Sequence, residues 1–144
     1  MKKNITNNED ETRRLGFALA KELKGGELVA LSGDLGAGKT KFLQGLAKGL
    51  GVNENVNSPT FNILKLYQTD KNKNNVIKIF CHVDAYRLEN AKDLVNLGIE
   101  ELLNQSDVIV AIEWADRVKD ILVNKVIKID IRHLGENKRE ITIK

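Results

Sequence analysis

The sequence predicts an α/β fold of three layers, in which a mixed sheet has parallel central strands and antiparallel hairpin additions. Three observations lead to this fold class. The apolar segment 27–33 precedes a glycine-rich loop and then a helical pattern, which places a buried strand ahead of a helix. The most apolar segment, "DVIVAIEW" at 107–114, suits a central strand covered on both faces. Alternating polar and apolar segments occur in pairs around polar turns, which is typical of hairpins.

The composition favours one domain that spans residues 1–144. Hydrophobic residues make up 42% of the chain and charged residues 30%, which suits a compact domain with a buried core. The net charge is only +3, and the basic residues are spread along the whole chain. A nucleic-acid-binding protein would gather them on one face, so we do not expect a direct nucleic-acid footprint.

The chain has no segment that predicts export or membrane insertion. The N-terminal lysines are not followed by an apolar stretch, so a signal peptide is not expected. The longest uninterrupted apolar run, 108–112, is far shorter than a membrane span. Cys81 is the only cysteine, which excludes an internal disulfide, and its apolar neighbours predict a buried thiol. These features predict a cytoplasmic protein with no membrane association.

Local patterns predict the elements in order. Residues 8–23 have apolar side chains at helical spacing, with acidic residues early and lysines late, so we expect a helix that ends at Gly25 and Gly26. A strand at 27–33 and a loop lead to a second helix, which starts near Lys39 and is stopped by glycines 49 and 51. The remaining expected elements are hairpin strands at 60–69 and 76–83 around a turn at 71–75, one or two short helices within 88–104 broken at Gly98, a strand at 107–114, and hairpin strands at 125–132 and 139–144 around a turn at 134–138.

The segment "GDLGAGKT" at 33–40 matches the P-loop pattern of nucleotide-binding proteins. Glycines let the backbone curl so that successive N–H groups face a phosphate, and the following helix adds its positive dipole end. The Lys39 ammonium would bridge the β- and γ-phosphates, and the Thr40 hydroxyl would bind Mg²⁺. With a strand before it and a helix after it, this loop predicts a P-loop NTPase-like fold and a nucleotide site.

The nucleotide is expected to be ATP. Guanine-specific switches usually carry an Asn-Lys-x-Asp element late in the chain. The Asn-Lys pair in "NKVI" at 124–127 has no aspartate in register.

Two carboxylates follow apolar strands and are candidates for the active site. Glu113 comes directly after five apolar residues, where a Mg²⁺-holding carboxylate would lie; otherwise it is a surface glutamate at a strand edge. Asp84 follows the strand ending at 83 and would orient or activate the attacking water, unless it serves as a helix cap or turn residue. His82 is interpreted as a core histidine because no Cys or His spacing supports zinc. Trp114 is either core packing or a wall of the nucleotide pocket.

Four segments together resemble the TsaE (YjeE) family, the small bacterial ATPase required for the threonylcarbamoyl modification of the adenosine next to the tRNA anticodon. They are "GDLGAGKT" at 33–40, "NSPTF" at 57–61, "HVDAYR" at 82–87 and "EW" at 113–114. The resemblance covers nearly the whole chain.

The resemblance implies roles for particular residues. Thr40 and Glu113 would be the magnesium ligands, and Asp84 matches a position tied to hydrolysis. Ser58 and Thr60 belong to the segment that senses the γ-phosphate, stiffened by Pro59. The catalytic set would be Lys39, Asp84 and Glu113, and the nucleotide-binding set would be Asp34, Leu35, Gly36, Ala37, Gly38, Lys39, Thr40, Lys41, Ser58, Thr60 and Trp114, with Thr6 and Thr12 near the adenine. Lys41 departs from the hydroxyl residue often found there, and it would approach the α-phosphate or point to solvent.

The resemblance also implies a partner. The family works with the TsaB–TsaD heterodimer, in which TsaD transfers the threonylcarbamoyl group, so contact with tRNA would be only indirect. ATP binding would let the small ATPase dock through the face that carries the P-loop and residues 58–60, and hydrolysis would reset the assembly. Two alternatives remain: a small-molecule kinase, although no arginine-rich lid follows the P-loop, and a nucleotide-dependent binding switch with negligible hydrolysis.

Overall fold

The computed structural model describes residues 1–34, 36–58, 62–70, 76–122 and 125–144. Within these residues, seven strands form one sheet in the order β1-β7-β6-β2-β5-β4-β3. Strands β6, β2, β5 and β4 are parallel to one another, whereas the pairs β1–β7, β7–β6 and β4–β3 are antiparallel. The strands are β1 Lys2–Thr6, β2 Leu28–Gly33, β3 Leu64–Gln68, β4 Ile79–Asp84, β5 Val108–Glu113, β6 Val126–Gly135 and β7 Lys138–Ile143; the helices are α1 Glu9–Ala20, α2 Lys39–Gly49, α3 Lys92–Val95, α4 Ile99–Leu103 and the 3₁₀ helix η1 Ala115–Ile121.

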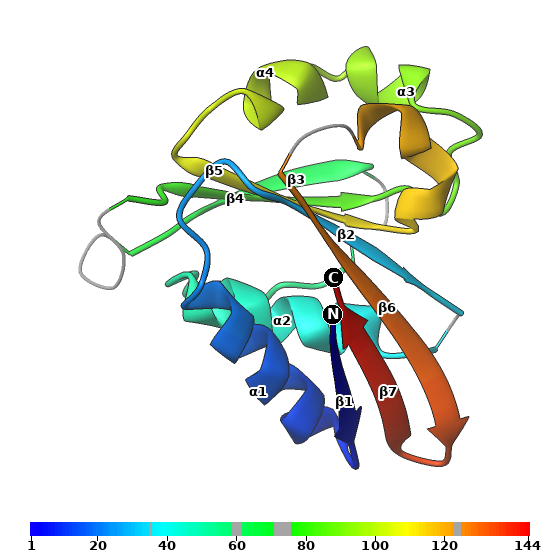
Figure 1. Ribbon diagram of the computed structural model, residues 1–144. Helices are drawn as coiled ribbons and strands as arrows, with labels where there is room; N and C mark the ends of the chain where they lie inside the picture. The colour runs from blue at the N-terminus through cyan, green and yellow to red at the C-terminus, as the bar shows by residue number, and fades with distance from the viewer. Residues whose placement is uncertain (35, 59–61, 71–75, 123–124) are drawn as a thin grey trace.

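Helices cover both faces of this sheet, so the fold has three layers (Figure 1). Helices α1 and α2 pack on one face, where Phe42 and Leu46 meet Ile109 and Ala111 of β5. The other face of the same strand, including Val110, packs against α3, α4 and η1. Because successive side chains of a strand point to opposite faces, a strand in the middle layer must be apolar on both. The predicted fold class, with its parallel centre and its two antiparallel hairpins, is confirmed.

The parallel strands bring their carboxyl ends to one edge of the sheet, and this edge carries the candidate site. In the β4–β5 ladder Asp84 lies directly opposite Glu113, and in the β2–β5 ladder Leu31 lies opposite Glu113. Strand β2 ends at Gly33, and the loop that precedes α2 follows it. The topology thus places the P-loop and the two predicted carboxylates together.

Helices α1 and α2 approach each other closely because glycines line their contact. At Gly45 an added Cβ would overlap the backbone carbonyl of Arg13, and at Gly16 it would overlap the carbonyl of Phe42. At Gly49 it would lie 2.6 Å from the Cβ of Ala20. A helix pair this close leaves no room for a side chain at these positions.

Several local predictions are confirmed. Gly98 separates α3 from α4 with a φ of 86°, a left-handed conformation that favours glycine. Cys81 is fully buried in the core on the α3–α4 face, and burial raises the pKa of its thiol to about 12. Segment 107–114 forms β5, which is buried along its whole length.

The element boundaries differ from the predictions in a few places. Helix α1 ends at Ala20, before the expected end at Gly25 and Gly26, and Asn8 is its N-cap, with its side chain accepting a hydrogen bond from the Glu11 N–H. Strand β3 begins at Leu64, and its turn toward β4 at 71–75, like Phe61, lies outside the described residues. Strand β6 continues to Gly135, so the last turn is shorter than expected.

Two elements were missed by the sequence patterns. Strand β1 has only one large apolar residue, Ile5, and that side chain is exposed; the strand exists because its backbone pairs with β7. Segment η1 consists of two short helical turns with a kink at Val118, whose φ of −131° and ψ of 41° are not helical. It buries Ala115, Val118 and Ile121, but because of the kink their three-residue spacing is not the period of one continuous helix.

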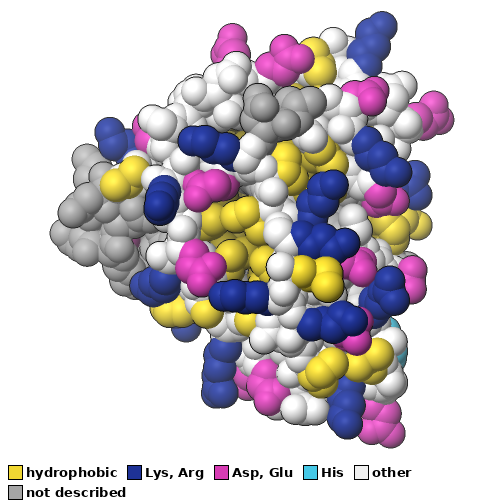
Figure 2. Space-filling view, viewed as in Figure 1, with side chains coloured by type: hydrophobic (Ala, Val, Ile, Leu, Met, Phe, Trp, Pro, Cys, Tyr) yellow, Lys and Arg dark blue, Asp and Glu magenta, His cyan; other side chains and the backbone are white. Residues whose placement is uncertain are grey.

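No helix in the part of the chain that the structure describes is long and apolar enough to cross a membrane. On the face seen in Figure 2, basic and acidic side chains are interspersed and do not separate into patches of one sign. This agrees with the spread of charge along the sequence.

Candidate nucleotide-binding site

The loop between β2 and α2 forms a cradle with its backbone. Gly36 and Gly38 have φ values of 77° and 104°, in the left-handed region that glycine enters without strain. The Ala37 N–H donates to the Asp34 carbonyl at 3.0 Å, which closes a turn inside the loop. The first N–H groups of α2 have no partner within the helix, and they begin directly at the end of this loop. Such an arrangement binds anions, phosphates in particular.

The Lys39 side chain lies inside the site and is only 5% exposed. Its Nζ donates to the carbonyls of Gly33 at 2.7 Å and Asp34 at 2.8 Å. The ammonium also lies 4.2 Å from the centre of the Trp114 ring, a cation–π contact. Burial lowers the pKa of Lys39, and the negative charge of Glu113 opposes this shift. The loop and the indole therefore hold the lysine in place beside the cradle.

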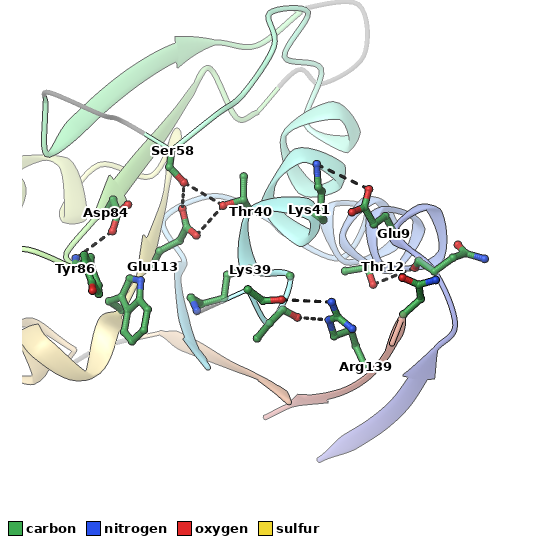
Figure 3. A pocket seen from close by; sticks show the side chains of 16 residues that line it. Glu9, Thr12, Lys39, Thr40, Lys41, Ser58, Asp84, Tyr86, Glu113 and Arg139 are labelled. Atoms are coloured by element: carbon green, nitrogen blue, oxygen red, sulfur yellow. Dashed lines mark hydrogen bonds and ion pairs between the residues drawn. The ribbon is translucent and has the colours of Figure 1, made fainter. Parts of the chain in front are cut away.

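Three oxygen-bearing side chains converge at the start of α2 (Figure 3). The Thr40 hydroxyl donates to Oε1 of Glu113 at 3.1 Å, and the Ser58 hydroxyl donates to Oε2 at 3.2 Å. The two hydroxyls lie 3.0 Å apart. One carboxylate with hydroxyls is the oxygen-only set that Mg²⁺ prefers when substrate phosphates supply further ligands. The described residues contain no cluster of three or more His, Cys, Asp or Glu side chains fit for a metal, so a dedicated transition-metal site is not present among them.

The pKa values of the two carboxylates of the site are shifted in opposite directions. Burial by itself would raise the pKa of Glu113, but hydrogen bonds from His82, Thr40 and Ser58 outweigh it and the net shift is downward. Burial raises the pKa of Asp84, and the negative charge of Glu113 adds to this, against a backbone hydrogen bond from Tyr86. A pair of acids separated in this way can divide the work, one staying ionised and one exchanging a proton.

These groups line one pocket of about 380 Å³. Two larger hollows, of about 830 and 680 Å³, contain neither the loop nor the carboxylates. Convergent polar groups identify a binding site better than volume does, so we assign the smaller pocket as the candidate site. Its lining includes Asn8, Glu9, Thr12, Gly36, Ala37, Gly38, Lys39, Thr40, Lys41, Ser58, Asp84, Tyr86, Glu113, Trp114, Asn137 and Arg139.

Comparison with known proteins decides the family. A family model described as "Threonylcarbamoyl adenosine biosynthesis protein TsaE" matches residues 6–141. The chain belongs to the TsaE family. It is 42% identical over 136 residues to the tRNA threonylcarbamoyladenosine biosynthesis protein TsaE of Rickettsia felis, which covers 94% of this chain and 75% of the relative. The TsaE protein of Bacillus subtilis is 38% identical over 137 residues, 95% of this chain and 81% of the relative.

A solved structure agrees with this assignment. The crystal structure of Bacillus subtilis YdiB matches with a TM-score of 0.78 and 33% identity, and the match covers 99% of this chain and 83% of that chain. The fold class and the resemblance to the TsaE family are thereby both confirmed. The TsaE family takes part in the biosynthesis of threonylcarbamoyladenosine.

Most of the expected nucleotide-binding residues of this TsaE-family chain lie around the pocket. Trp114 lines it and also packs against the core on the α3–α4 face, which is compatible with both interpretations of its role. Lys41 lines it as well, and its Nζ lies 3.9 Å from a Glu9 carboxylate oxygen. Asp34 contributes to the loop through its backbone carbonyl, which accepts from Lys39. Leu35, Thr60 and Pro59 lie outside the described residues.

The two N-terminal threonines have different places. Thr12, on α1, lines the pocket, whereas Thr6, at the end of β1, is buried and does not. Their hydroxyl oxygens lie 2.8 Å apart. Any direct contact with a nucleotide would therefore come from Thr12, with Thr6 holding it from behind.

The structure adds Arg139, which sequence reasoning missed. This residue lies on β7, yet its Nε donates to the Ala37 carbonyl at 2.8 Å and its Nη2 to the Gly36 carbonyl at 3.3 Å. The guanidinium thus ties the C-terminal hairpin to the cradle loop (Figure 3). An arginine in an alternating strand carries no local signal for such a contact, which depends on the pairing of distant segments.

Replacing Arg139 by alanine is expected to weaken ATP binding about tenfold, since a hydrogen bond from a charged group contributes about 1.5–3 kcal/mol and this one orders the loop. Titration with a fluorescent ATP analogue would measure the change. Arg132→Ala is the matched control, because Arg132 lies on the neighbouring strand β6 and contacts only the exposed Asp130 carboxylate, at 3.2 Å. Equal affinities for Arg139→Ala and the parent protein would rule out a loop-ordering role.

Proposed function

We propose that this TsaE-family protein is a Mg²⁺-dependent ATPase that supports the threonylcarbamoyl modification of tRNA in the cytoplasm. The observation that carries the proposal is the cluster of Thr40, Ser58 and Glu113 at the end of a P-loop pocket. A hydroxyl at the first turn of the P-loop helix beside a buried, ionised carboxylate is the arrangement that P-loop ATPases need for a metal–nucleotide complex.

The phosphates would lie on the backbone N–H groups between Gly36 and Thr40, with the Lys39 ammonium against the β- and γ-phosphates. Thr40 and Glu113 would hold Mg²⁺, with the Ser58 hydroxyl donating to Glu113 and lying 3.0 Å from the Thr40 hydroxyl. When bound, Mg²⁺ would neutralise charge on the phosphate oxygens. To reach a phosphate, the Lys39 ammonium would exchange its two carbonyl partners, Gly33 and Asp34, for phosphate oxygens. Only the end of the lysine side chain would need to move.

Asp84 would act on the attacking water. It lies opposite Glu113 in the β4–β5 ladder, lines the same pocket, and has a raised pKa. A carboxylate with a raised pKa is a better proton acceptor than an ordinary aspartate, so Asp84 would orient the water and take its proton. Glu113, with its lowered pKa, stays ionised for the metal.

ATP is the proposed nucleotide because the chain lacks the Asn-Lys-x-Asp element of guanine-specific switches. The base would lie toward the side of the pocket lined by Asn8 and Thr12, away from the carboxylates. The product would be ADP, held by the same loop.

The partner proposed is the TsaB–TsaD heterodimer, with tRNA reached only through it. Ser58 supports a link between nucleotide state and docking, because its hydroxyl donates to Glu113 and lies 3.0 Å from the Thr40 hydroxyl. A change in the metal–phosphate site would therefore alter the contacts of Ser58 itself. The docking face would be the one that carries the P-loop and Ser58, since a γ-phosphate sensor has to touch what it controls.

The test is ATP hydrolysis by the purified chain, alone and with the TsaB–TsaD pair, with Lys39→Ala as control. We expect the pair to stimulate hydrolysis, and Lys39→Ala to lower the stimulated rate by about 100-fold or more, because it removes the cation that faces the transferred phosphate. Turnover that ignores the pair and rises with a small acceptor would favour a kinase. Nucleotide-dependent docking without any turnover would favour a binding switch.

A further inference from the structure

His82 makes a short contact with the active-site carboxylate Glu113, and the proposed function assigns it no role. This histidine lies on β4 and is fully buried, as the sequence interpretation of a core histidine required. Its Nε2, however, lies 2.7 Å from Oε2 of Glu113, the shortest contact in the network around that carboxylate. Its Nδ1 has no hydrogen-bond partner among the described residues. The polar part of this side chain is therefore committed to Glu113 alone.

The surrounding core keeps the imidazole in one orientation. The ring stacks on Phe80, with centroids 6.3 Å apart and an interplanar angle of 24°. Phe80 packs in turn against Tyr67, at 6.2 Å between centroids. Both aromatic neighbours are nearly or fully buried, so the ring has no room to rotate away from Glu113.

The contact distinguishes the two oxygens of the Glu113 carboxylate. Oε2 accepts from His82 and Ser58, whereas Oε1 accepts from Thr40. A carboxylate only accepts hydrogen bonds, so Nε2 is the donor in this contact.

We propose that His82 is a positioning residue that anchors Oε2 of Glu113 in the sheet and so presents Oε1, beside Thr40, to Mg²⁺. The inference rests on the proposed function and deepens it. A hydrogen bond from behind a metal-binding carboxylate restricts its rotation, and loss of such a support typically costs about 10–100-fold in metal affinity or activity.

The experiment compares His82→Gln with His82→Met. The two replacements have similar length and volume, but only glutamine places an N–H donor near the position of Nε2. Nucleotide affinity is measured with Mg²⁺ and with EDTA, and hydrolysis is measured against Mg²⁺ concentration. Cys81→Ala is the control for a small loss of packing on β4, because Cys81 is buried on the opposite face of the sheet.

For His82→Met we expect the Mg²⁺ concentration at half-maximal hydrolysis to rise about tenfold or more. We also expect the affinity gain that Mg²⁺ confers on ATP to shrink, while the affinity in EDTA stays within about twofold of the parent value. His82→Gln should recover most of both losses, and Cys81→Ala should show neither. An equal loss in His82→Gln and His82→Met would overturn the proposal, as would a parent-like Mg²⁺ response in His82→Met.

A second measurement separates this inference from the proposed function. Unfolding by urea is compared for His82→Met, Glu113→Met and the double variant. If His82 and Glu113 act through their mutual hydrogen bond, the loss of stability in the double variant is smaller than the sum of the two single losses. Additive losses would overturn the anchoring itself. Non-additive losses in a protein whose nucleotide binding ignores Mg²⁺ would instead reject the ATPase proposal and keep the His82–Glu113 pair.

Discussion

ATP turnover is expected to fall about 10²–10⁴-fold when Asp84 is replaced by asparagine, while ATP affinity stays within about threefold of the parent value. Asparagine has the shape of aspartate and keeps a carbonyl oxygen for the Tyr86 N–H, which donates to Oδ1 at 3.0 Å. It cannot accept a proton from water. The loss therefore falls on the chemical step and spares the binding of the phosphates by the loop and Lys39.

The measurement is single-turnover hydrolysis with the TsaB–TsaD pair present, together with an affinity titration. Asp93→Asn serves as the control, since Asp93 is an exposed aspartate on α3, outside the pocket. Full turnover in Asp84→Asn would show that this side chain takes no part in hydrolysis. Absence of turnover in the parent protein, with or without the pair, would favour the binding switch.

Replacing Gly45 by alanine is expected to lower the free energy of unfolding by about 3 kcal/mol, the upper range for overpacking a tight contact. The added methyl group would overlap the Arg13 carbonyl of α1, and backbone atoms cannot move aside as a flexible side chain can. For a chain of this size the midpoint of thermal unfolding would fall by roughly 10 °C. Replacing glycine by alanine within a helix normally raises the free energy of unfolding by about 1 kcal/mol. A net decrease in stability would therefore be caused by the clash with Arg13.

Thermal and urea unfolding would measure this, with Gly98→Ala as the matched glycine replacement. Gly98 has a positive φ but no heavy atom within 4 Å of an added Cβ, so only backbone strain of about 1–2 kcal/mol is expected there. If Gly45→Ala were as stable as the parent protein, α1 and α2 would not be packed as closely as the structure describes. Because α2 begins at the P-loop, a displaced α2 should also weaken ATP binding.

The site shows how far local patterns reach. Lys39 and Thr40 follow from the loop and helix pattern, and Glu113 and Asp84 follow from polar residues at the ends of apolar strands. The structure brings all four to one pocket. His82 stands in the same sequence segment as Asp84, yet nothing in its spacing indicates that its Nε2 reaches Glu113, because that contact crosses between strands 31 residues apart.

By itself the sequence determined the fold class, the glycine-rich loop and the two carboxylates at the strand ends, since each depends on residues that are neighbours in the chain or on the period of a single element. Only the tertiary structure decided the places of β1, Thr6 and Arg139, and the partner of His82. Their contacts join segments that are far apart in sequence, such as β7 with the cradle loop. The sequence pattern around a polar residue in a strand is the same whether its side chain faces water or a distant loop. The order of the strands in the sheet decides which of the two it faces.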